Sequence, residues 1–486
     1  MSVSEEDYVT GSRPQAAATA AVSVQERPVV CVQGLGFVGT AMALATANAR
    51  TADGAPCYDV VGVELDNETG HERARAINEG RLPIASADPR MAAALADALE
   101  TGNLLATTDP EAYTRASVAV VDIALDLTLD NGAPTVDFTG LRAAIRLLAT
   151  RLPTGSLVVV ETTVPPGTCQ NVIAPEMEDA LAARGLPPDS LLLAHAYERV
   201  MPGADYLDSI VNFWRVYAGR TPEAADACER FLQNVVNVGA YPLTRVGSTT
   251  ASEIGKVLEN SYRATTIAFM EEWGRFAESV GVDLFEVISA IRVRPTHANM
   301  RQPGFGVGGY CLTKDPLFAE YGARELFGLD DVRFPFCRQA VEINRTMPLV
   351  TLDKVDELLG GLQGKRVLLL GVSYRQGVGD TRHSPSAVFV SHARERGADV
   401  VAHDPMVSSW HDDETLPPDL PAPAGFDAVV FAVPHLEYRD VDLELWLADA
   451  RPLVLDANDV LSVDRLRRLA ATGCRVWSIG RGPIAA

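Results

Sequence analysis

The chain has 486 residues, more than one hydrophobic core usually covers, so we expect two or three domains. Hydrophobic residues make up 47% and charged residues 22%, as in ordinary soluble globular proteins. The formal net charge of -22 argues against binding to nucleic acid or to an anionic membrane. An anionic substrate would therefore need a local basic pocket that works against the overall field.

The cysteines and the N-terminal segment predict the compartment. Seven cysteines are scattered without a CxxC pair, which indicates a reducing cytosol and gives neither a zinc site nor a disulfide framework. Residues 1–27 lack the basic start and apolar core of a signal peptide, and we expect a disordered extension there. No apolar run reaches the roughly 18 residues of a membrane span. The sequence thus predicts a cytoplasmic protein without a resident metal.

A dinucleotide-binding pattern opens the first domain, which we expect over residues 28–245. An apolar run at 29–32 leads into Gly34-Leu35-Gly36-Phe37-Val38-Gly39 and an Ala-rich helical stretch. Gly34 would make the turn, Gly36 would let a pyrophosphate approach the backbone, and Gly39 would let the helix pack on the strand. Glu64 ends the next predicted strand, 58–65, where a carboxylate would bind adenosine ribose hydroxyls. This favours NAD over NADP, because a carboxylate repels a 2′-phosphate.

Alternating strands and helices continue through this domain. Strands at 117–125, 156–161 and 190–194, with helices at 91–100 and 141–149, predict a doubly wound parallel sheet that binds ligands at its carboxyl ends. Thr163 and the pair Glu198-Arg199 follow two such ends. A Glu–Arg pair on a loop is most often a surface ion pair. At this edge it could instead be a base with its orienting cation.

A long helix dominates the central domain, predicted over residues 246–360. A capping box at 250–253 starts the helix, which should run to about residue 281. Apolar residues at 254, 257, 258, 267, 270, 273, 276, 277 and 280 predict a broad buried stripe, which would serve intrachain packing or a homodimer interface. Lys256, Asn260 and Arg263 share one face, which is either solvated or the wall of a polar site.

The third domain, residues 361–486, repeats the α/β pattern. Strands at 365–372, 399–403, 428–433, 453–455 and 476–479 are separated by helices. The turn at 373–385 carries Arg375 and Arg382 near two glycines, which fits a phosphate better than an adenosine. We therefore expect an α/β fold with two doubly wound Rossmann-like parallel-sheet domains joined by a long central helix.

A glycine-rich segment with a lone cysteine, residues 303–316, lies between these units. Four glycines in six positions require a tight turn or a close approach of backbone. Cys311 follows directly, with Thr313-Lys314-Asp315 next to it. In an electropositive, partly open setting Cys311 would be a thiolate nucleophile, and in a buried one a small hydrophobe. Taken alone, the segment favours the structural role.

Six motifs in order resemble the nucleotide-sugar 6-dehydrogenase family, which includes UDP-glucose, GDP-mannose and UDP-N-acetylhexosamine dehydrogenases. They are GLGFVG at 34, TTVPPGT at 162, ERVMPG at 198, the 253–260 segment, GFGVGGYCLTKD at 304 and GDTRHSP at 379, and the resemblance covers residues 28–486. It implies that the 6-hydroxymethyl group of a UDP-sugar is oxidised to the uronic acid with two NAD per sugar.

The resemblance also implies roles for single residues. Cys311 would bind the intermediate aldehyde as a thiohemiacetal and then a thioester, while Lys256 and Asn260 stabilise oxyanions. Thr163 and Asp315 would hold the water, and Glu198 would be the general base of hydrolysis. Further substrate contacts implied are Arg199, Phe305, Gly306, Gly308, Gly309, Arg375 and Arg382, with Arg382 and Thr163 also next to NAD.

Departures from the family pattern keep alternatives open. Residues 83–86 and 122–126 differ on the nicotinamide side, Tyr197 replaces a proline, and an expected arginine corresponds to one of Arg292, Arg294, His297 and Arg301. The ERVMPG form favours a UDP-N-acetylhexosamine, whereas Lys314-Asp315 favours UDP-glucose. A two-electron dehydrogenase with a structural Cys311 and an inactive nucleotide-sugar binder are the two rival hypotheses.

Overall fold

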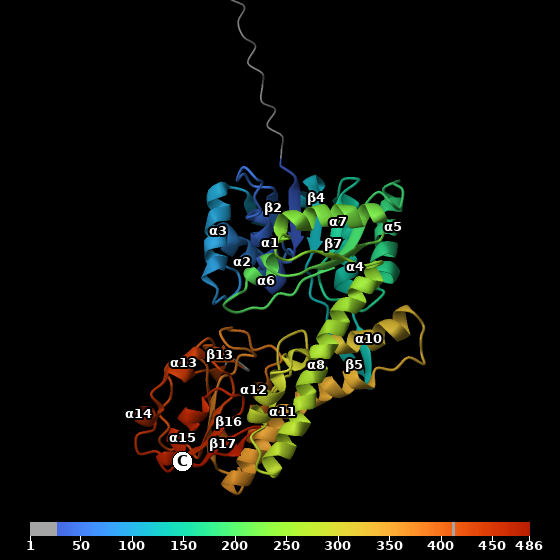
Figure 1. Ribbon diagram of the computed structural model, residues 1–486. Helices are drawn as coiled ribbons and strands as arrows, with labels where there is room; N and C mark the ends of the chain where they lie inside the picture. The colour runs from blue at the N-terminus through green and yellow to red at the C-terminus, as the bar shows by residue number, and fades with distance from the viewer. Residues whose placement is uncertain (1–26, 411–413) are drawn as a thin grey trace, which may run out of the picture.

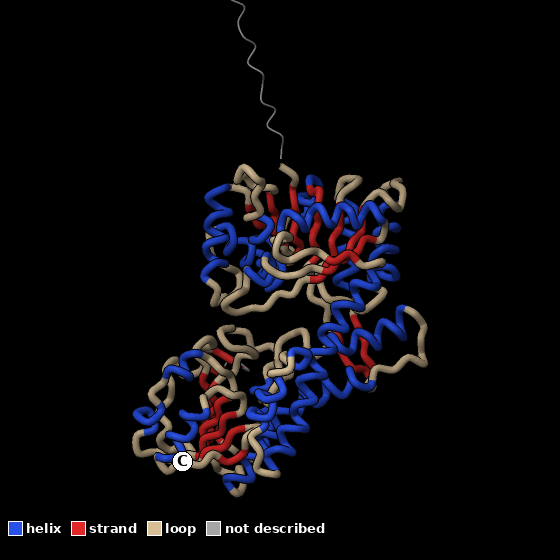
Figure 2. The backbone as a smooth tube through the Cα atoms, viewed as in Figure 1, coloured by secondary structure: helices blue, strands red, loops and turns tan. Residues whose placement is uncertain are grey.

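Two α/β lobes joined by one long helix make up the protein, in a computed structural model that describes residues 27–410 and 414–486. Helix α8 (Thr249–Ser279) runs from the upper lobe into the lower half of the molecule in Figure 1. In each lobe the strands lie in the middle with helices around them, as Figure 2 shows. The predicted fold class is confirmed. Apart from Arg27, the predicted N-terminal extension lies outside the described residues.

The first lobe contains an eight-stranded sheet. In spatial order its strands are β10 (Thr244–Arg245), β9 (Val216–Gly219), β8 (Leu192–Tyr197), β7 (Leu157–Val160), β4 (Ala116–Val121), β1 (Val29–Gln33), β2 (Asp59–Val63) and β3 (Leu104–Thr107). All neighbours are parallel except β8 and β9, an antiparallel pair that the sequence did not predict. The strand order reverses between β1 and β4, so a crevice opens at their carboxyl ends.

Helices cover both faces of this sheet. They are α1 (Phe37–Ala47), α2 (Glu68–Asn78), α3 (Pro89–Thr101), α4 (Thr139–Arg151), α5 (Ala174–Ala183), α6 (Asp208–Val211) and α7 (Pro222–Val235), with a 3₁₀ turn η1 (Pro110–Arg115) and a π-turn η2 (Cys169–Ile173). Small residues let α1 pack closely, and it is buried from Gly39 to Ala47. Asp88 caps α3, which ends at Gly102 with a left-handed φ of 72°.

An antiparallel hairpin leaves the first lobe directly after β4. It consists of β5 (Leu127–Asp130) and β6 (Ala133–Val136), and it was not predicted. Figure 1 shows β5 away from the large sheet and beside α10 (Phe318–Tyr321), which β6 contacts. We call residues 126–136 the arm.

Helix α8 corrects two predictions. Its N-cap is Ser248, whose side chain accepts from the Ala251 N–H, so the capping box at 250–253 was wrong. The buried carboxylate of Glu253 instead accepts from the N–H groups of Gly167 and Cys169. The buried stripe was also wrong, because many of its apolar residues are exposed: Ile254, Leu258, Trp273, Phe276 and Val280.

The remaining central elements surround α8. They are α9 (Leu284–Arg292), η3 (Pro295–His297), η4 (Asp315–Leu317), α10, the π-turn η5 (Gly322–Leu326) and α11 (Pro335–Leu359). Helix α11 packs along α8, and the small side chains of Ala264, Ala268 and Ala340 lie together in this contact. Small residues allow the two helix backbones to approach closely, which stiffens the link between the lobes.

The third-domain sheet has the spatial order β12 (Asp399–His403), β11 (Arg366–Leu370), β15 (Ala428–Phe431), β16 (Leu453–Asp456), β17 (Val476–Ser478) and β18 (Gly482–Pro483). Only the last pair is antiparallel. The lobe also contains α12 (Pro385–Glu395), α13 (Leu436–Asp440), α14 (Leu443–Leu447), α15 (Val463–Ala471) and a small ladder of β13 (Ser409–Trp410) with β14 (Glu414–Thr415). Over the described ranges, no helix is long and apolar enough to cross a membrane.

Candidate active site

The glycine fingerprint forms a cradle at the carboxyl end of β1. A Cβ on Gly39 would lie 1.8 Å from the Gly34 carbonyl oxygen, and one on Gly34 2.9 Å from the Asp122 carbonyl oxygen, so both positions require glycine. A Cβ on Gly36 would meet no described atom within 4 Å, so space is open before the first turn of α1. No side chain caps that turn. Open space and free N–H groups at a helix N-terminus fit the pyrophosphate of a dinucleotide.

Glu64 lies beside this cradle. Its carboxylate accepts from the Leu35 N–H at 2.6 Å and from Arg73 at 3.0 Å. The side chain is only 7% exposed. Glu64 is therefore fixed next to the fingerprint at the end of β2, where the ribose of NAD binds in such folds.

The Cys311 loop is fastened to the central helices and to the third domain. Asn344 of α11 bonds both backbone groups of Val307, at 2.8 and 2.6 Å, and the Gly309 N–H donates to the Arg382 carbonyl at 3.0 Å. A Cβ on Gly308 would lie 2.6 Å from the His383 carbonyl oxygen, so glycine permits this close docking. The Phe305 side chain, predicted to contact substrate, instead packs on Phe389 in the third-domain core.

The Cys311 thiol is solvent-accessible, but protein atoms crowd it. This crowding, reinforced by Asp315 and opposed by Lys256, raises its pKa to about 11. The electropositive setting considered from the sequence is thus outweighed by desolvation. At neutral pH the free enzyme therefore holds Cys311 as a thiol.

A buried ion pair lies next to Cys311. The Lys256 ammonium donates to the backbone carbonyl of Glu198 at 2.6 Å and to its carboxylate at 3.1 Å. Burial opposes the Lys256 charge, but Glu198 and Cys311 contribute most to outweighing it, and the pKa of Lys256 is raised. Lys256 is therefore a charged donor inside the site.

Asp315 forms the other side of the site. Its two carboxylate oxygens accept from Asn260 at 2.8 Å and from Lys314 at 2.7 Å. Burial raises the pKa of Asp315 despite these donors. Thr163 is half-buried on the loop that follows β7, and Glu253 holds the same loop from α8. Lys256, Asn260, Cys311 and Asp315 are thus brought together as the sequence predicted.

The Arg199 side chain binds groups other than the Glu198 carboxylate. Its guanidinium binds the Glu259 carboxylate at 2.9 and 3.0 Å and the Trp214 carbonyl. The cation that orients Glu198 is therefore Lys256 and not the neighbouring Arg199. The Tyr197 ring lies between these two cations, 5.6 Å from Lys256 and 5.1 Å from Arg199.

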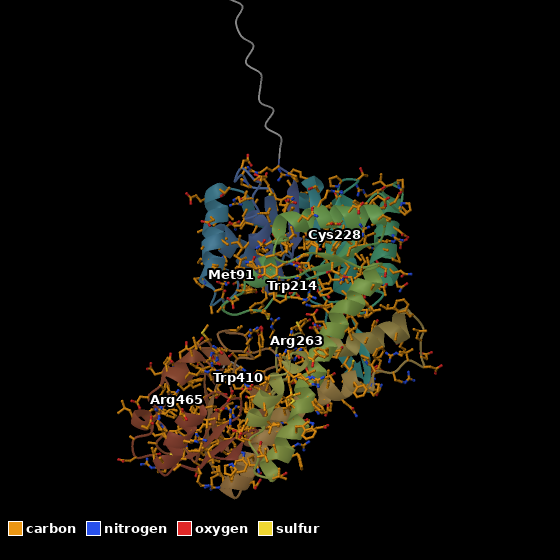
Figure 3. All side chains as sticks on the ribbon, in the orientation of Figure 1. Met91, Trp214, Cys228, Arg263, Trp410 and Arg465 are labelled. Carbon is orange, nitrogen blue, oxygen red and sulfur yellow. The ribbon has the colours of Figure 1, made fainter. Side chains whose placement is uncertain are left out.

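Several arginines gather where the lobes meet. Arg382 forms an ion pair with Asp380 at 2.7 Å and lies 5.1 Å from the Phe37 ring of the fingerprint. Figure 3 shows Arg263 of α8 between the lobes. Burial, then Arg301 and more weakly Arg375, lower the Arg263 pKa, so these cations lie close together. This is the local basic pocket that an anionic substrate needs in an acidic protein.

A cavity of about 280 Å³ continues from this group. Its lining residues are Ile267, Arg292, Arg301, Gln302, Pro303, Gly304, Gly306, Val307, Met347 and Asn458. Among the four candidates for the displaced arginine, Arg292 and Arg301 line it. Arg292 already donates to the Met300 carbonyl at 2.9 Å, so Arg301 is the freer cation.

A buried carboxyl pair, Asp122 and Glu161, lies at the carboxyl ends of β4 and β7, and Asp122 belongs to the segment that departs from the family pattern. The Glu161 carboxylate pairs with Arg215, and both side chains are about 1% exposed. The two Asp122 oxygens are buried without a hydrogen-bond partner among the described residues. Burial and the neighbouring Glu161 raise the pKa of Asp122 well above its usual value.

Comparison with known proteins identifies the family. Three domain models of the UDP-glucose/GDP-mannose dehydrogenase family match the chain. The NAD binding domain model matches residues 29–236, the central domain model residues 250–346, and the UDP binding domain model residues 368–463. The chain belongs to the UDP-glucose/GDP-mannose dehydrogenase family. It is an NAD-dependent oxidoreductase, and the UDP binding domain indicates a UDP-sugar substrate.

Relatives of this family member match nearly end to end. A UDP-N-acetyl-D-mannosamine dehydrogenase of Pyrococcus horikoshii is 30% identical over 94% of this chain and 100% of its own length. One of Methanocaldococcus jannaschii is 28% identical over 93% and 96%. A solved UDP-D-ManNAc dehydrogenase from P. horikoshii has a TM-score of 0.76 at 28% identity, covering 93% and 99%. An NDP-N-acetyl-D-galactosaminuronic acid dehydrogenase from Methanosarcina mazei has 0.75 at 25%, covering 94% and 96%.

Sequence reasoning missed several residues that build the site. Asn344 and Arg215 lie far along the chain from the groups that they hold, and no local pattern marks them. Glu253 was recognised only as a helix cap. Asp122 did carry a signal, because a carboxyl directly after a buried parallel strand lies at the ligand-binding edge.

Proposed function

We propose that this dehydrogenase oxidises the 6-hydroxymethyl group of a UDP-N-acetylhexosamine to the uronic acid, a four-electron reaction through Cys311. The proposal rests on one observation: the exposed residue Cys311 has its thiol beside Lys256, Glu198 and Asp315. The ERVMPG motif and the names of the first relatives support an N-acetylhexosamine over glucose.

The first oxidation converts the primary alcohol to an aldehyde. The Gly34–Gly39 cradle and Glu64 would hold NAD, which would supply the hydride acceptor for each of the two oxidations. The Lys256 ammonium lies near Cys311, and the Asn260 amide is held by Asp315 on the other side of the site. Both groups would act as donors that stabilise oxygen-centred negative charge at C6. Arg375, Arg301 and Arg263 would bind the diphosphate by charge.

Cys311 then retains the aldehyde. Its sulfur bonds to C6, the carbonyl π bond breaks, and the thiol proton is transferred to the former carbonyl oxygen, so no net acid or base is consumed. This suits a thiol with a pKa of about 11. Loss of the second hydride and of that proton gives the thioester.

Hydrolysis ends the cycle. Thr163 and Asp315 would hold a water molecule, and Glu198 would accept its proton as its oxygen adds to the thioester carbon. The C–S bond then breaks and Cys311 is reprotonated. One alcohol, one water and two NAD+ thus give one carboxylate, two NADH and three protons.

Counting NADH tests this proposal. UDP-ManNAc, UDP-GlcNAc, UDP-GalNAc, UDP-glucose and GDP-mannose would be converted to completion and NADH measured by absorbance. We expect two NADH per molecule of a UDP-N-acetylhexosamine and no acid from Cys311→Ser. One NADH per sugar would support the two-electron alternative, in which Cys311 is structural. Binding without NADH would support an inactive binder.

We also propose that the protein is a homodimer through the exposed face of α8. Phe269, Trp273 and Phe276 form a ladder of edge-to-face rings there, and each is at least 46% exposed. Contiguous exposed aromatic surface on this scale marks an interface. Sedimentation should show Trp273→Glu as a monomer and the control Leu445→Glu, in the third domain, as a dimer. A dimeric Trp273→Glu would refute this assignment.

A further inference from the structure

The arm, residues 126–136, ties the first lobe to the central helices. Arg338 donates to the Gly132 carbonyl at 2.7 Å, and Arg324 to the Pro134 carbonyl at 2.9 Å. These bonds hold the hairpin against η5 and α11. The third bond is at the other end of the arm, where the Asp126 carboxylate accepts from the Tyr310 hydroxyl. The arm is thus fixed at both ends, and its Asp126 end is bonded to Tyr310, the residue next to Cys311.

Tyr310 makes a second set of contacts through its ring. The Lys314 ammonium lies 4.3 Å from the ring centre of Tyr310 and 4.4 Å from that of Phe318, so two rings enclose it. The same ammonium donates to Asp315 at 2.7 Å. Lys314 and Asp315 have opposite effects on the Cys311 thiol, so their placement sets its charge environment.

The third domain reaches the same tyrosine. The Arg382 guanidinium lies 5.5 Å from the Tyr310 ring and 5.1 Å from the Phe37 ring of the fingerprint. The His383 ring is tilted against Tyr310 at 6.3 Å. Groups from the NAD-binding lobe, the Cys311 loop and the third domain therefore converge on one side chain.

We propose that Tyr310 is a positioning residue whose hydroxyl, held by Asp126, fixes the Cys311 loop against the NAD-binding lobe, and whose ring fixes Lys314 beside Asp315. This role rests on the proposed function of Cys311. Asp126 closes the segment that departs from the family pattern, whereas Tyr310 lies within the GFGVGGYCLTKD motif, between Gly309 and Cys311. The bond between them makes the two positions interdependent.

The two contacts can be separated by substitution. Tyr310→Phe removes the hydroxyl but keeps the ring over Lys314, Tyr310→Leu removes both, and Asp126→Asn weakens the acceptor. The loss of this exposed hydrogen bond to a charged group should favour an open loop by about tenfold. An open loop relieves the crowding around the thiol, and Cys311 should react faster.

The measurement is the rate constant for alkylation of Cys311 by iodoacetamide at fixed pH, without substrate, with Cys311→Ser as the blank for other thiols. We expect Tyr310→Phe and Asp126→Asn each to raise the rate about tenfold, and the double variant to react no faster than either one. Tyr217→Phe, which removes a tyrosine–carboxylate bond to Glu229 inside the first lobe, is the matched control and should leave the rate unchanged.

Tyr310→Leu tests the contact between the Tyr310 ring and Lys314. Because it also frees Lys314, its alkylation rate should have a different pH dependence from that of Tyr310→Phe. Unchanged rates in Tyr310→Phe, or effects that multiply in the double variant, would overturn the proposal. The assay needs no turnover, so a failure of the sugar oxidation itself would be seen separately, as absence of NADH from the unmodified enzyme.

Discussion

The protonation state of Cys311 gives the sharpest prediction for the free enzyme. Its pKa is raised from an ordinary 9.0 to about 11 by desolvation and by Asp315. Below both values the thiolate fraction is therefore about a hundredfold lower than that of an ordinary cysteine, which corresponds to about 3 kcal/mol. The alkylation rate at pH 7 should be reduced to match, since the thiolate is the reactive form.

The assay is alkylation of Cys311 between pH 7 and 10, again corrected with Cys311→Ser. The rate should rise about tenfold per pH unit without reaching a plateau, because the whole range lies below the pKa. Asp315→Asn removes a charge that raises this pKa and should speed the reaction, whereas Lys256→Met removes one that lowers it and should slow the reaction. A plateau below pH 9, or the two variants changing the rate in the opposite senses, would refute the reasoning.

Three further predictions concern the substrate, the buried acid and the helix link. Arg301→Gln should raise KM for the UDP-sugar about tenfold or more by removing a charge-assisted contact, while Arg294→Gln, outside the cavity lining, should leave it nearly unchanged in steady-state assays. The pKa of Asp122 is raised on folding. The contribution of Asp122 to the free energy of unfolding is therefore full below the unfolded pKa of about 4, and it is lost as the pH rises towards the folded pKa. The Tm of Asp122→Asn should therefore rise relative to the Tm of the unmodified protein as the pH increases from 5 to 8. A difference in Tm that does not change with pH would contradict this. Glu253→Gln should lower the free energy of unfolding by about 1.5–3 kcal/mol in urea titrations, because one of two charged hydrogen bonds to the 167–169 backbone is lost.

The parallel lobes were predictable because their signals are local. The strand at 399–403 was placed at its observed bounds, and the strand, glycine turn and helix at 29–47 were recognised from order and composition. Departures from regular patterning were not predictable. The antiparallel β9 and the arm depend on tertiary pairing, which segments of about four residues do not reveal by their own sequence.

Helix α8 shows where periodicity stops being informative. Its apolar positions were predicted to form a buried stripe, but they are exposed at Trp273 and Phe276 because α11 covers a different face. Periodicity gives the direction of a side chain and not the neighbour that meets it. In the same way, Glu253 had the spacing of a helix cap, but its carboxylate accepts hydrogen bonds from a buried backbone turn 84–86 residues away in the sequence.

For the site, spacing on one helix face brought Lys256 and Asn260 together correctly, and the loop motif placed Cys311 beside Asp315. What the sequence could not give was the balance of desolvation against charge. Two lysines next to Cys311 suggest an activated thiolate, and the raised pKa shows that crowding and Asp315 outweigh them.

The most direct test of the account is the mass of the enzyme during turnover. Glu198→Gln, which lacks the proposed base of hydrolysis, would be mixed with NAD and the UDP-sugar that gives the highest rate, then digested and analysed by mass spectrometry. The account predicts a peptide containing Cys311 that carries the oxidised nucleotide sugar as a thioester, formed with two NADH per adduct. An unmodified Cys311 peptide from a variant that still releases NADH would contradict it.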